Sequence, residues 1–294
     1  MEMLNNRLQD MKAKMLYAKL DKDFSIESLK DDWSFMRFNE YISPLFKKRY
    51  MGIVLDNTEE VKKVYTATIP DTDILEKLIH TGETDILLFS HHAMGYDPTI
   101  KGFPFYNIPE DYLEKLKQQR ISFYVLHAPL DKNGEYSTSV SLAKKLNLEI
   151  IDEFCEYEGV KCGVICKTGI KKATKLAEYI CSMVGHEVKL IRSGDDVIHD
   201  SRVAIAAGGG SVGFAAKELS GLGINMYITG CTRLVPSVEP IMEFHRIISE
   251  RKINVIGATH YTTEKYACIA MVRYFEKLGI PAEFLEGRYY LEDL

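Results

Sequence analysis

The chain of 294 residues contains few cysteines and no long apolar run. Its six cysteines, at positions 155, 162, 166, 181, 231 and 268, are too sparse for the disulfide framework of a secreted scaffold. The N-terminus lacks the apolar core of a secretory signal, and no stretch approaches the roughly 18 consecutive apolar residues that span a bilayer. These absences favour a cytoplasmic protein that folds without disulfides and has no membrane partner.

A broad excess of basic residues is also missing. The formal net charge is -5 and the Lys and Arg residues are scattered, so no extended positive surface is expected to attract phosphate backbones. Nucleic-acid binding is therefore disfavoured. The composition, with 46% hydrophobic and 27% charged residues, is that of a globular protein whose length favours two domains over one large domain.

The first twenty residues carry an amphipathic pattern. Leu4, Leu8, Met11 and Met15 recur at steps of four and three between polar residues, which predicts a helix over about residues 1–25. Its apolar face can pack on its own domain, contact another subunit or lie on a membrane surface. The mixed charge of the polar face favours the first of these and disfavours the last.

From about residue 50, short β-branched or aromatic runs alternate with longer stretches of helical period. The predicted strands are 61–69, 84–90, 121–126, 163–166, 188–191, 202–207, 224–229 and 253–258. The predicted helices are 71–81, 109–119, 171–184, 238–250 and 262–278, with another ending at Leu219. Strands separated by helices of this length indicate βαβ units and largely parallel sheets, and hence an α/β fold.

Three groups of metal-binding side chains occupy equivalent places, each just after an apolar strand. They are His91 and His92 after ILLFS, His127 and Asp131 after ISFYVL, and His260 and Glu264 after NVIGA. Open α/β sheets bind ligands beyond the carboxyl ends of their strands, so these groups can converge if the strands are neighbours. Imidazole and carboxylate together suit zinc, iron or manganese, and a carboxylate can bridge two ions.

The spacing inside each group makes further predictions. Adjacent histidines in extended backbone point to opposite sides, so His91 and His92 would serve two metals unless the chain turns sharply. His260 and Glu264, four residues apart, share a face if one helix includes both. Between His127 and Asp131 stands Pro129, which argues for a loop.

Other motifs have simpler interpretations. The run Gly208–Gly213 can cradle a phosphate, but it matches no nucleotide-binding motif and favours a tight strand-to-helix turn. Cys162 and Cys166 lie along a predicted strand, too far apart to share a zinc ion, and are expected to be core or surface thiols. Trp33 carries no motif of its own, and the four remaining histidines, at 80, 186, 199 and 245, are expected on the surface or at caps.

Five short motifs together resemble a known family. They are Ser90-His-His-Ala, His127-Ala-Pro-Leu-Asp131, Ala206-Ala-Gly-Gly-Gly-Ser211, Ile228-Thr-Gly230 and Gly257-Ala-Thr-His-Tyr-Thr-Thr-Glu264. In this order they resemble the dinuclear-metal family of GTP cyclohydrolase I type 2 homologues, also called Ngg-one-interacting-factor-three-like proteins, over about residues 40–290. Ala93 and Cys231 depart from the Pro and the acidic residue usual in that family.

The resemblance implies two similar domains with mixed, largely parallel sheets flanked by helices and a metal site between the domains. The first domain would comprise residues 26–132 and 232–294 and the second residues 133–231, with the N-terminal helix of residues 1–25 as an addition. Family members assemble as hexamers, so a homohexamer is expected.

The same resemblance implies two divalent ions, held by ligands that carry over by position: His91, His92, Asp131, His260 and Glu264. His127 would lie beside them as a ligand or proton-transfer group. This arrangement fits a metal-dependent hydrolase acting on a nucleotide or another phosphorylated small molecule. The alternative is a non-catalytic metal-binding scaffold or regulatory interaction protein, and direct DNA binding is a weaker third.

Overall fold

A computed structural model describes residues 11–157 and 159–294 and divides the chain into two compact units. The first unit contains the described part of Met1–Tyr96, together with Phe105–Pro129 and Cys268–Gly287. The second contains Asp97–Pro104, Leu130–Ala267 and Arg288–Leu294. Both units are of the α/β class, as the alternation of strands and helices predicts.

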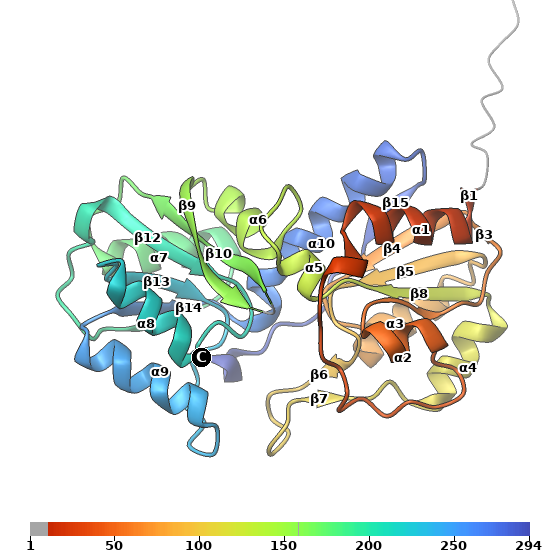
Figure 1. Cartoon of the computed structure of the whole chain (residues 1–294), viewed down its shortest axis with the longest axis horizontal. Coiled ribbons are helices and arrows are strands. Elements are labelled where there is room, and N and C mark those ends of the chain that lie inside the picture. The colour runs from red at the N-terminus through yellow and green to blue at the C-terminus, as the bar shows by residue number, and fades with distance from the viewer. Residues whose placement is uncertain (1–10, 158) are drawn as a thin grey trace, which may run out of the picture. The chain divides into compact units, whose positions relative to one another are not determined.

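The first unit is built on a five-stranded mixed sheet (Figure 1). Its strands, in spatial order, are β15 (Ala282–Phe284), β4 (Lys63–Ala67), β5 (Ile86–Ser90), β8 (Ile121–Val125) and β2 (Gly52–Leu55). The first four are parallel, and β2 pairs with β8 in the antiparallel direction. Since β5 and β8 are parallel neighbours, the residues that follow them emerge at the same edge of the sheet.

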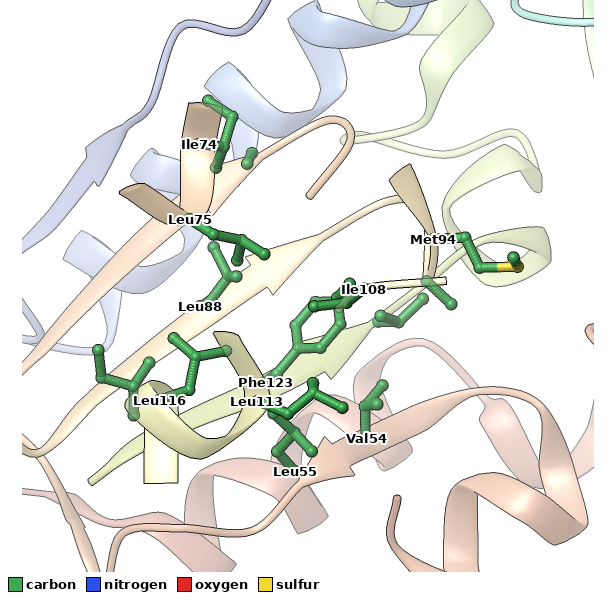
Figure 2. Close-up of a cluster of buried hydrophobic side chains, with 14 of the residues drawn as sticks. Val54, Leu55, Ile74, Leu75, Leu88, Met94, Ile108, Leu113, Leu116 and Phe123 are labelled. Atoms are coloured by element: carbon green, nitrogen blue, oxygen red, sulfur yellow. The ribbon is translucent and has the colours of Figure 1, made fainter. Parts of the chain in front are cut away.

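Helices cover both faces of this sheet, which explains why its strands β5 and β8 are buried at every position. On one face, Leu88 and Phe123 pack with residues of α3 (Thr72–His80) and α4 (Glu110–Gln118), as Figure 2 shows. On the other face, Phe89 and Tyr124 contact Phe275 of α10 (His260–Lys277) and Tyr17 of α1 (Ala13–Asp23). Alternate side chains of each strand therefore enter two separate cores.

The remaining elements of the first unit are short. They are β1 (Met11–Lys12), η1 (Ile26–Ser28), α2 (Pro44–Arg49), β3 (Glu60–Val61), β6 (Gly95–Tyr96) and β7 (Phe105–Tyr106). Strand β1 pairs with β3 and β6 pairs with β7, both antiparallel.

The N-terminal helix differs from its prediction. Of the expected apolar stripe, Leu4 and Leu8 lie outside the described residues, and Met15 is 66% exposed. The buried face of α1 consists of Ala13, Leu16, Tyr17 and Leu20. Its contacts with the first sheet show that the described helix packs on its own unit.

The second unit contains a six-stranded mixed sheet. Its strands, in order, are β11 (Lys189–Ile191), β14 (Asn254–Gly257), β13 (Met226–Thr229), β12 (Arg202–Ala206), β10 (Val160–Lys167) and β9 (Glu149–Tyr157). The three strands β14, β13 and β12 are parallel, and the flanking pairings are antiparallel. The sequence did not predict β9, whose first five residues are exposed at the sheet edge.

Two helical layers enclose this sheet as well. Strand residues such as Ile205 and Ile228 pack with α6 (Thr138–Lys145) and α7 (Ala173–Val184). Their neighbours in the strands, such as Ala204 and Tyr227, pack with α8 (Gly213–Gly221) and α9 (Glu239–Glu250). The short elements α5 (Ala128–Asp131), η2 (His199–Ser201) and η3 (Leu291–Asp293) complete the described chain.

The second domain extends further along the chain than the predicted residues 133–231. Residues 232–267 are expected in the first domain, but β14 pairs in parallel with β13 in the six-stranded sheet and α9 packs beside α8 on that sheet. The chain returns to the first unit only at Cys268, within α10.

None of the helices in the described ranges is long and apolar enough to cross a bilayer.

An ion-pair cluster holds the start of β5, and it gives a stability prediction. Arg120 donates to Asp85 Oδ1 at 2.6 Å and to Oδ2 at 2.8 Å, and Lys62 donates to Oδ2 at 2.8 Å. These bonds, with Arg120 contributing most, lower the pKa of Asp85. We expect Asp85→Asn to lower the free energy of unfolding by about 1 kcal/mol at pH 7, measured by urea denaturation.

The pH dependence follows from the sign of this shift. An aspartate whose pKa is lowered by folding stabilises the fold above its unfolded pKa of about 3.9, and this contribution disappears as pH falls toward the folded value. The gap between wild type and Asp85→Asn should therefore begin to narrow below about pH 4 and continue to shrink as the pH falls further. Asp111→Asn, which removes an exposed pair with Lys115, is the control and should change stability by less than about 0.5 kcal/mol. An equal loss in both variants would contradict the prediction.

Candidate metal centre

Three histidines gather where the parallel strands β5 and β8 end. One ring nitrogen from each of His91, His92 and His127 lies within 4.8 Å of the others. The His127 ring centroid is 4.9 Å from that of His91 and 5.2 Å from that of His92. Adjacent parallel strands bring these residues together, which confirms the predicted convergence of His127 with His91 and His92.

The two adjacent histidines do not diverge as extended backbone would require. Strand β5 ends at Ser90, and the His91 and His92 ring centroids are only 4.6 Å apart at an interplanar angle of 73°. The chain turns at this point, with Ser90 Oγ donating to the His92 carbonyl. Both rings, each at most 1% exposed, therefore contribute to one cluster.

Hydrogen bonding fixes which nitrogen His91 offers. Its Nδ1 lies 2.9 Å from the Leu126 carbonyl oxygen, which can only accept. Nδ1 therefore carries the proton, and the lone pair of the neutral ring is on Nε2. A partner on the far nitrogen is the usual support of a metal-binding histidine.

Asp31 supports His127 in the same way, although no sequence pattern signals this role. The Asp31 carboxylate lies 3.2 Å from His127 Nδ1 and accepts the Ala128 backbone N–H at 3.1 Å. Burial opposes ionisation of Asp31, but His127 and the backbone donors outweigh it and lower its pKa. Only Asp31's position in the folded chain, beside the end of β8, reveals this role.

Trp33, to which the sequence assigned no role, packs against two of the histidines. Its ring meets that of His127 edge to face at 5.1 Å and that of His92 at 5.9 Å. Phe105 contacts both Trp33 and His92, at 5.6 and 5.3 Å. These aromatic rings exclude water from one side of the histidine cluster.

A second group of candidate ligands lies in the second unit. His260 Nε2 is 3.1 Å from Glu264 Oε1 because both residues fall in the first turns of α10, as their spacing predicts. Carboxylate oxygens of Asp131 and Glu264 lie within 4.8 Å of each other. Asp131 Oδ1 also accepts a bond from Thr138 Oγ1 at 2.9 Å. This group therefore combines one imidazole with two carboxylates.

The segment between His127 and Asp131 is not the loop that Pro129 suggested. Residues Ala128–Asp131 form the short helix α5. A proline in the first turn of a helix loses no intrahelical hydrogen bond, so Pro129 is compatible with it. The helix ends at Asp131, which belongs to the second unit together with Thr138 and Glu264.

The glycine run after β12 lies against His260 and Glu264 and leaves space for their side chains. Gly208 has a φ of +66°, and a Cβ added there would lie 2.0 Å from Glu264 Oε1 and 3.3 Å from His260 Nε2. Its N–H donates to Thr263 Oγ1 at 2.9 Å, and its carbonyl accepts the N–H groups of Gly230 and Cys231 at 3.1 Å. The run is a tight turn fitted to α10, as the simpler interpretation of the sequence held.

Further contacts hold the first turn of α10. Asp293 Oδ2 accepts the His260 N–H at 2.9 Å, so a carboxylate caps the positive end of the helix. His186 Nε2 lies 2.8 Å from Thr262 Oγ1, and its ring stacks on Tyr289. His186 is thus a buried support for α10, whereas the sequence predicted a surface or cap residue, and burial lowers its pKa.

Electrostatics within the second group favour a bound cation. Burial disfavours protonation of His260, yet the Glu264 carboxylate and the Cys231 thiol raise the pKa of His260 well above its usual value. An imidazolium is one cation that this group accepts. A divalent ion would take its place by displacing the proton, as metal ligation by histidine requires.

The strands that precede the candidate ligands belong to two sheets, and the cysteines lie outside the ligand groups. His260 and Glu264 follow a strand of the six-stranded sheet, whereas His91 and His127 follow strands of the five-stranded sheet, so the three strands are not neighbours in one sheet. All six cysteines are free thiols, and Cys162 and Cys166 lie along β10 as predicted. The candidate ligands thus follow strands of two different sheets.

Comparison with known proteins identifies relatives over most of the chain. Residues 43–286 match the family model described as Duf34/NIF3 (NGG1p interacting factor 3). A protein of Archaeoglobus fulgidus named GTP cyclohydrolase 1 type 2 homolog is 30% identical over 240 residues, covering 80% of this chain and 88% of that protein. A protein of the same name from Pyrococcus horikoshii is 30% identical over 252 residues, covering 84% and 92%.

Solved structures share the fold. The protein ybgI, of unknown function, is 18% identical with a TM-score of 0.72, covering 95% of this chain and 99% of that one. TTHA1606 from Thermus thermophilus is 24% identical with a TM-score of 0.67, covering 96% and 100%. The fold thus extends over nearly the whole chain, including segments that the family model does not match.

The contact between Gly208 and the ligand pair gives a direct test. In Gly208→Ala, the new methyl group meets the Glu264 carboxylate and a positive φ disfavours it, so Glu264 must move. We expect the affinity for Zn²⁺, measured by competition with a chromophoric chelator, to fall by at least about tenfold.

Gly209→Ala is the matched control for this substitution. A Cβ at Gly209 meets no atom within 4 Å, and its φ is not positive. Zn²⁺ affinity of this variant should stay within about twofold of wild type. Equal affinities for both variants would show that Gly208 does not shape the metal site.

Proposed function

Because this chain belongs to the Duf34/NIF3 family, we propose that it holds two divalent metal ions with His91, His92, Asp131, His260 and Glu264. The observation that carries the proposal is the pair of compact, mostly buried ligand groups, one of imidazoles and one dominated by carboxylates. Histidines alone or carboxylates alone have many structural roles. Buried clusters of both suit zinc, iron or manganese.

Covalent continuity supports the proposal that both groups serve one centre. His127 and Asp131 are separated by four residue steps, which span at most about 14 Å even in extended chain. Asp131 is in turn close to Glu264. The two groups are therefore tethered by a segment of only a few residues.

The chemistry that such a centre supports best is hydrolysis of a nucleotide or another phosphorylated small molecule. Two bound ions would supply Lewis acidity, activating water and stabilising negative charge on the substrate. The neutral Nε2 of His127 would accept or return a proton beside them. Glu264 and Asp131 would fix the spacing of the ions, and the Trp33 and Phe105 rings would keep bulk water away from the histidines.

The names of the relatives narrow the choice of substrates to test. The similar proteins of Archaeoglobus and Pyrococcus are named GTP cyclohydrolase 1 type 2 homolog, which places GTP first in a panel of nucleotides. We further propose that the functional protein is cytoplasmic and forms a homohexamer. Light scattering of the purified protein tests the hexamer.

Metal content tests the centre itself. We expect about two divalent ions per wild-type chain by elemental analysis, and one or fewer in His91→Ala and Glu264→Ala. His199→Ala is the control, because His199 is exposed and pairs only weakly with Asp195. Wild-type metal content in His91→Ala would refute the assignment of His91 as a ligand.

Turnover tests the hydrolase proposal separately. Metal-loaded protein should hydrolyse at least one compound of a nucleotide, phosphoester and amide panel, and Glu264→Ala should reduce that rate at least about a hundredfold. Full metal content without turnover of any compound would instead support the metal-binding scaffold or regulatory protein.

A further inference from the structure

The segment Asp31–Trp33 contacts the histidine cluster although it lies outside the family-matched residues 43–286. It follows η1 and belongs to no helix or strand. Asp31 and Trp33 are nevertheless 8% and 2% exposed. A buried aspartate needs hydrogen-bond donors to offset the cost of its burial. The donors to Asp31 therefore indicate its role.

Asp31 has three hydrogen-bond donors. Two belong to His127 and the residue after it, and the third is the backbone N–H of the next residue in the chain. Asp31 Oδ1 faces His127 Nδ1 at 3.2 Å and accepts the Asp32 N–H at 2.9 Å. Oδ2 accepts the Ala128 N–H at 3.1 Å. The carboxylate thus binds both the ring of His127 and the backbone that follows it. An ionised carboxylate only accepts, so His127 Nδ1 must carry a proton.

Trp33 restricts the same ring from another direction. The edge-to-face contact with His127, at an angle of 78°, leaves the imidazole little room to rotate about its χ2 torsion. A flipped ring would exchange Nδ1 for a carbon and break the bond to Asp31. Contact with Trp33 therefore restricts the plane of the His127 ring, and the bond to Asp31 selects which of its two flipped orientations the ring takes.

We propose that Asp31 is a positioning residue for His127: it fixes the tautomer protonated on Nδ1 and directs the Nε2 lone pair toward His91 and His92. His91 presents its own Nε2 by the equivalent bond to Leu126. Two of the three clustered imidazoles are then protonated on Nδ1, and each has the Nε2 lone pair available to bind a cation. The contribution of Asp31 to metal binding rests on the proposed function, whereas the tautomer of His127 does not.

Nitrogen NMR of ring-labelled protein measures the tautomer directly. In metal-free wild type at about pH 8, the signal that disappears in His127→Gln should show the pattern of a ring protonated on Nδ1 alone. Asp31→Asn should convert this signal to a mixture of tautomers. Asp32→Asn is the matched control, since the Asp32 side chain accepts from Ser34 and does not contact His127. It should leave the signal unchanged.

Zn²⁺ affinity supplies the second measurement. Asp31→Asn should weaken binding by about tenfold, the usual effect of losing the partner of a metal-site histidine, and Asp32→Asn by less than about twofold. Because Asp31 acts through His127, the double variant Asp31→Asn/His127→Gln should bind no more weakly than His127→Gln alone.

The outcomes separate this inference from the proposed function. A wild-type His127 protonated on Nε2, or an unchanged tautomer in Asp31→Asn, would overturn the role of Asp31 whatever the metal content. Wild-type protein that binds no metal, with His127 still fixed on Nδ1 by Asp31, would refute the metal centre and leave the positioning role intact. Additive losses in the double variant would show that Asp31 does not act through His127.

Discussion

Burial of imidazole and carboxylate groups at the ends of apolar strands is the constraint on which the whole site depends. Such groups are costly to bury unless each finds a hydrogen-bond partner or a counter-charge. The chain meets this requirement with contacts from outside the strands: Leu126 and Asp31 behind the histidines, and Thr138 and Asp293 around the second group. The same partners that make burial tolerable also fix the direction of the ligand atoms.

The elements that follow from short-range pattern were predictable from the sequence. Apolar runs such as ILLFS become strands covered on both faces, and the 3.6-residue period gives α3, α4, α7 and α9 nearly to the residue. The clustering of His91, His92 and His127 followed from one rule, that parallel neighbouring strands end at one edge. The spacing of His260 and Glu264 was equally reliable, because both fall in one helix.

What the sequence could not provide depends on pairing between distant segments. Which sheet β14 joins is decided by its contact with β13, and no local pattern records that choice. Asp31 and Trp33 lie about 95 residues from His127 in the chain, within a loop without periodicity, so only the fold reveals their contact. The turn that brings the His91 and His92 rings together is likewise set by Ser90 and not by strand geometry.

Gly208 shows how easily one kind of sequence signal can be mistaken for another. Three consecutive glycines between a strand and a helix invite comparison with a phosphate-binding loop, where small residues let a ligand approach the backbone. Here the group that approaches is a carboxylate of the same chain. Glycine at this position is a clearance requirement imposed by an internal side chain. In related sequences, a residue with a side chain in place of Gly208 should therefore be accompanied by loss of Glu264, since the two side chains would occupy the same space.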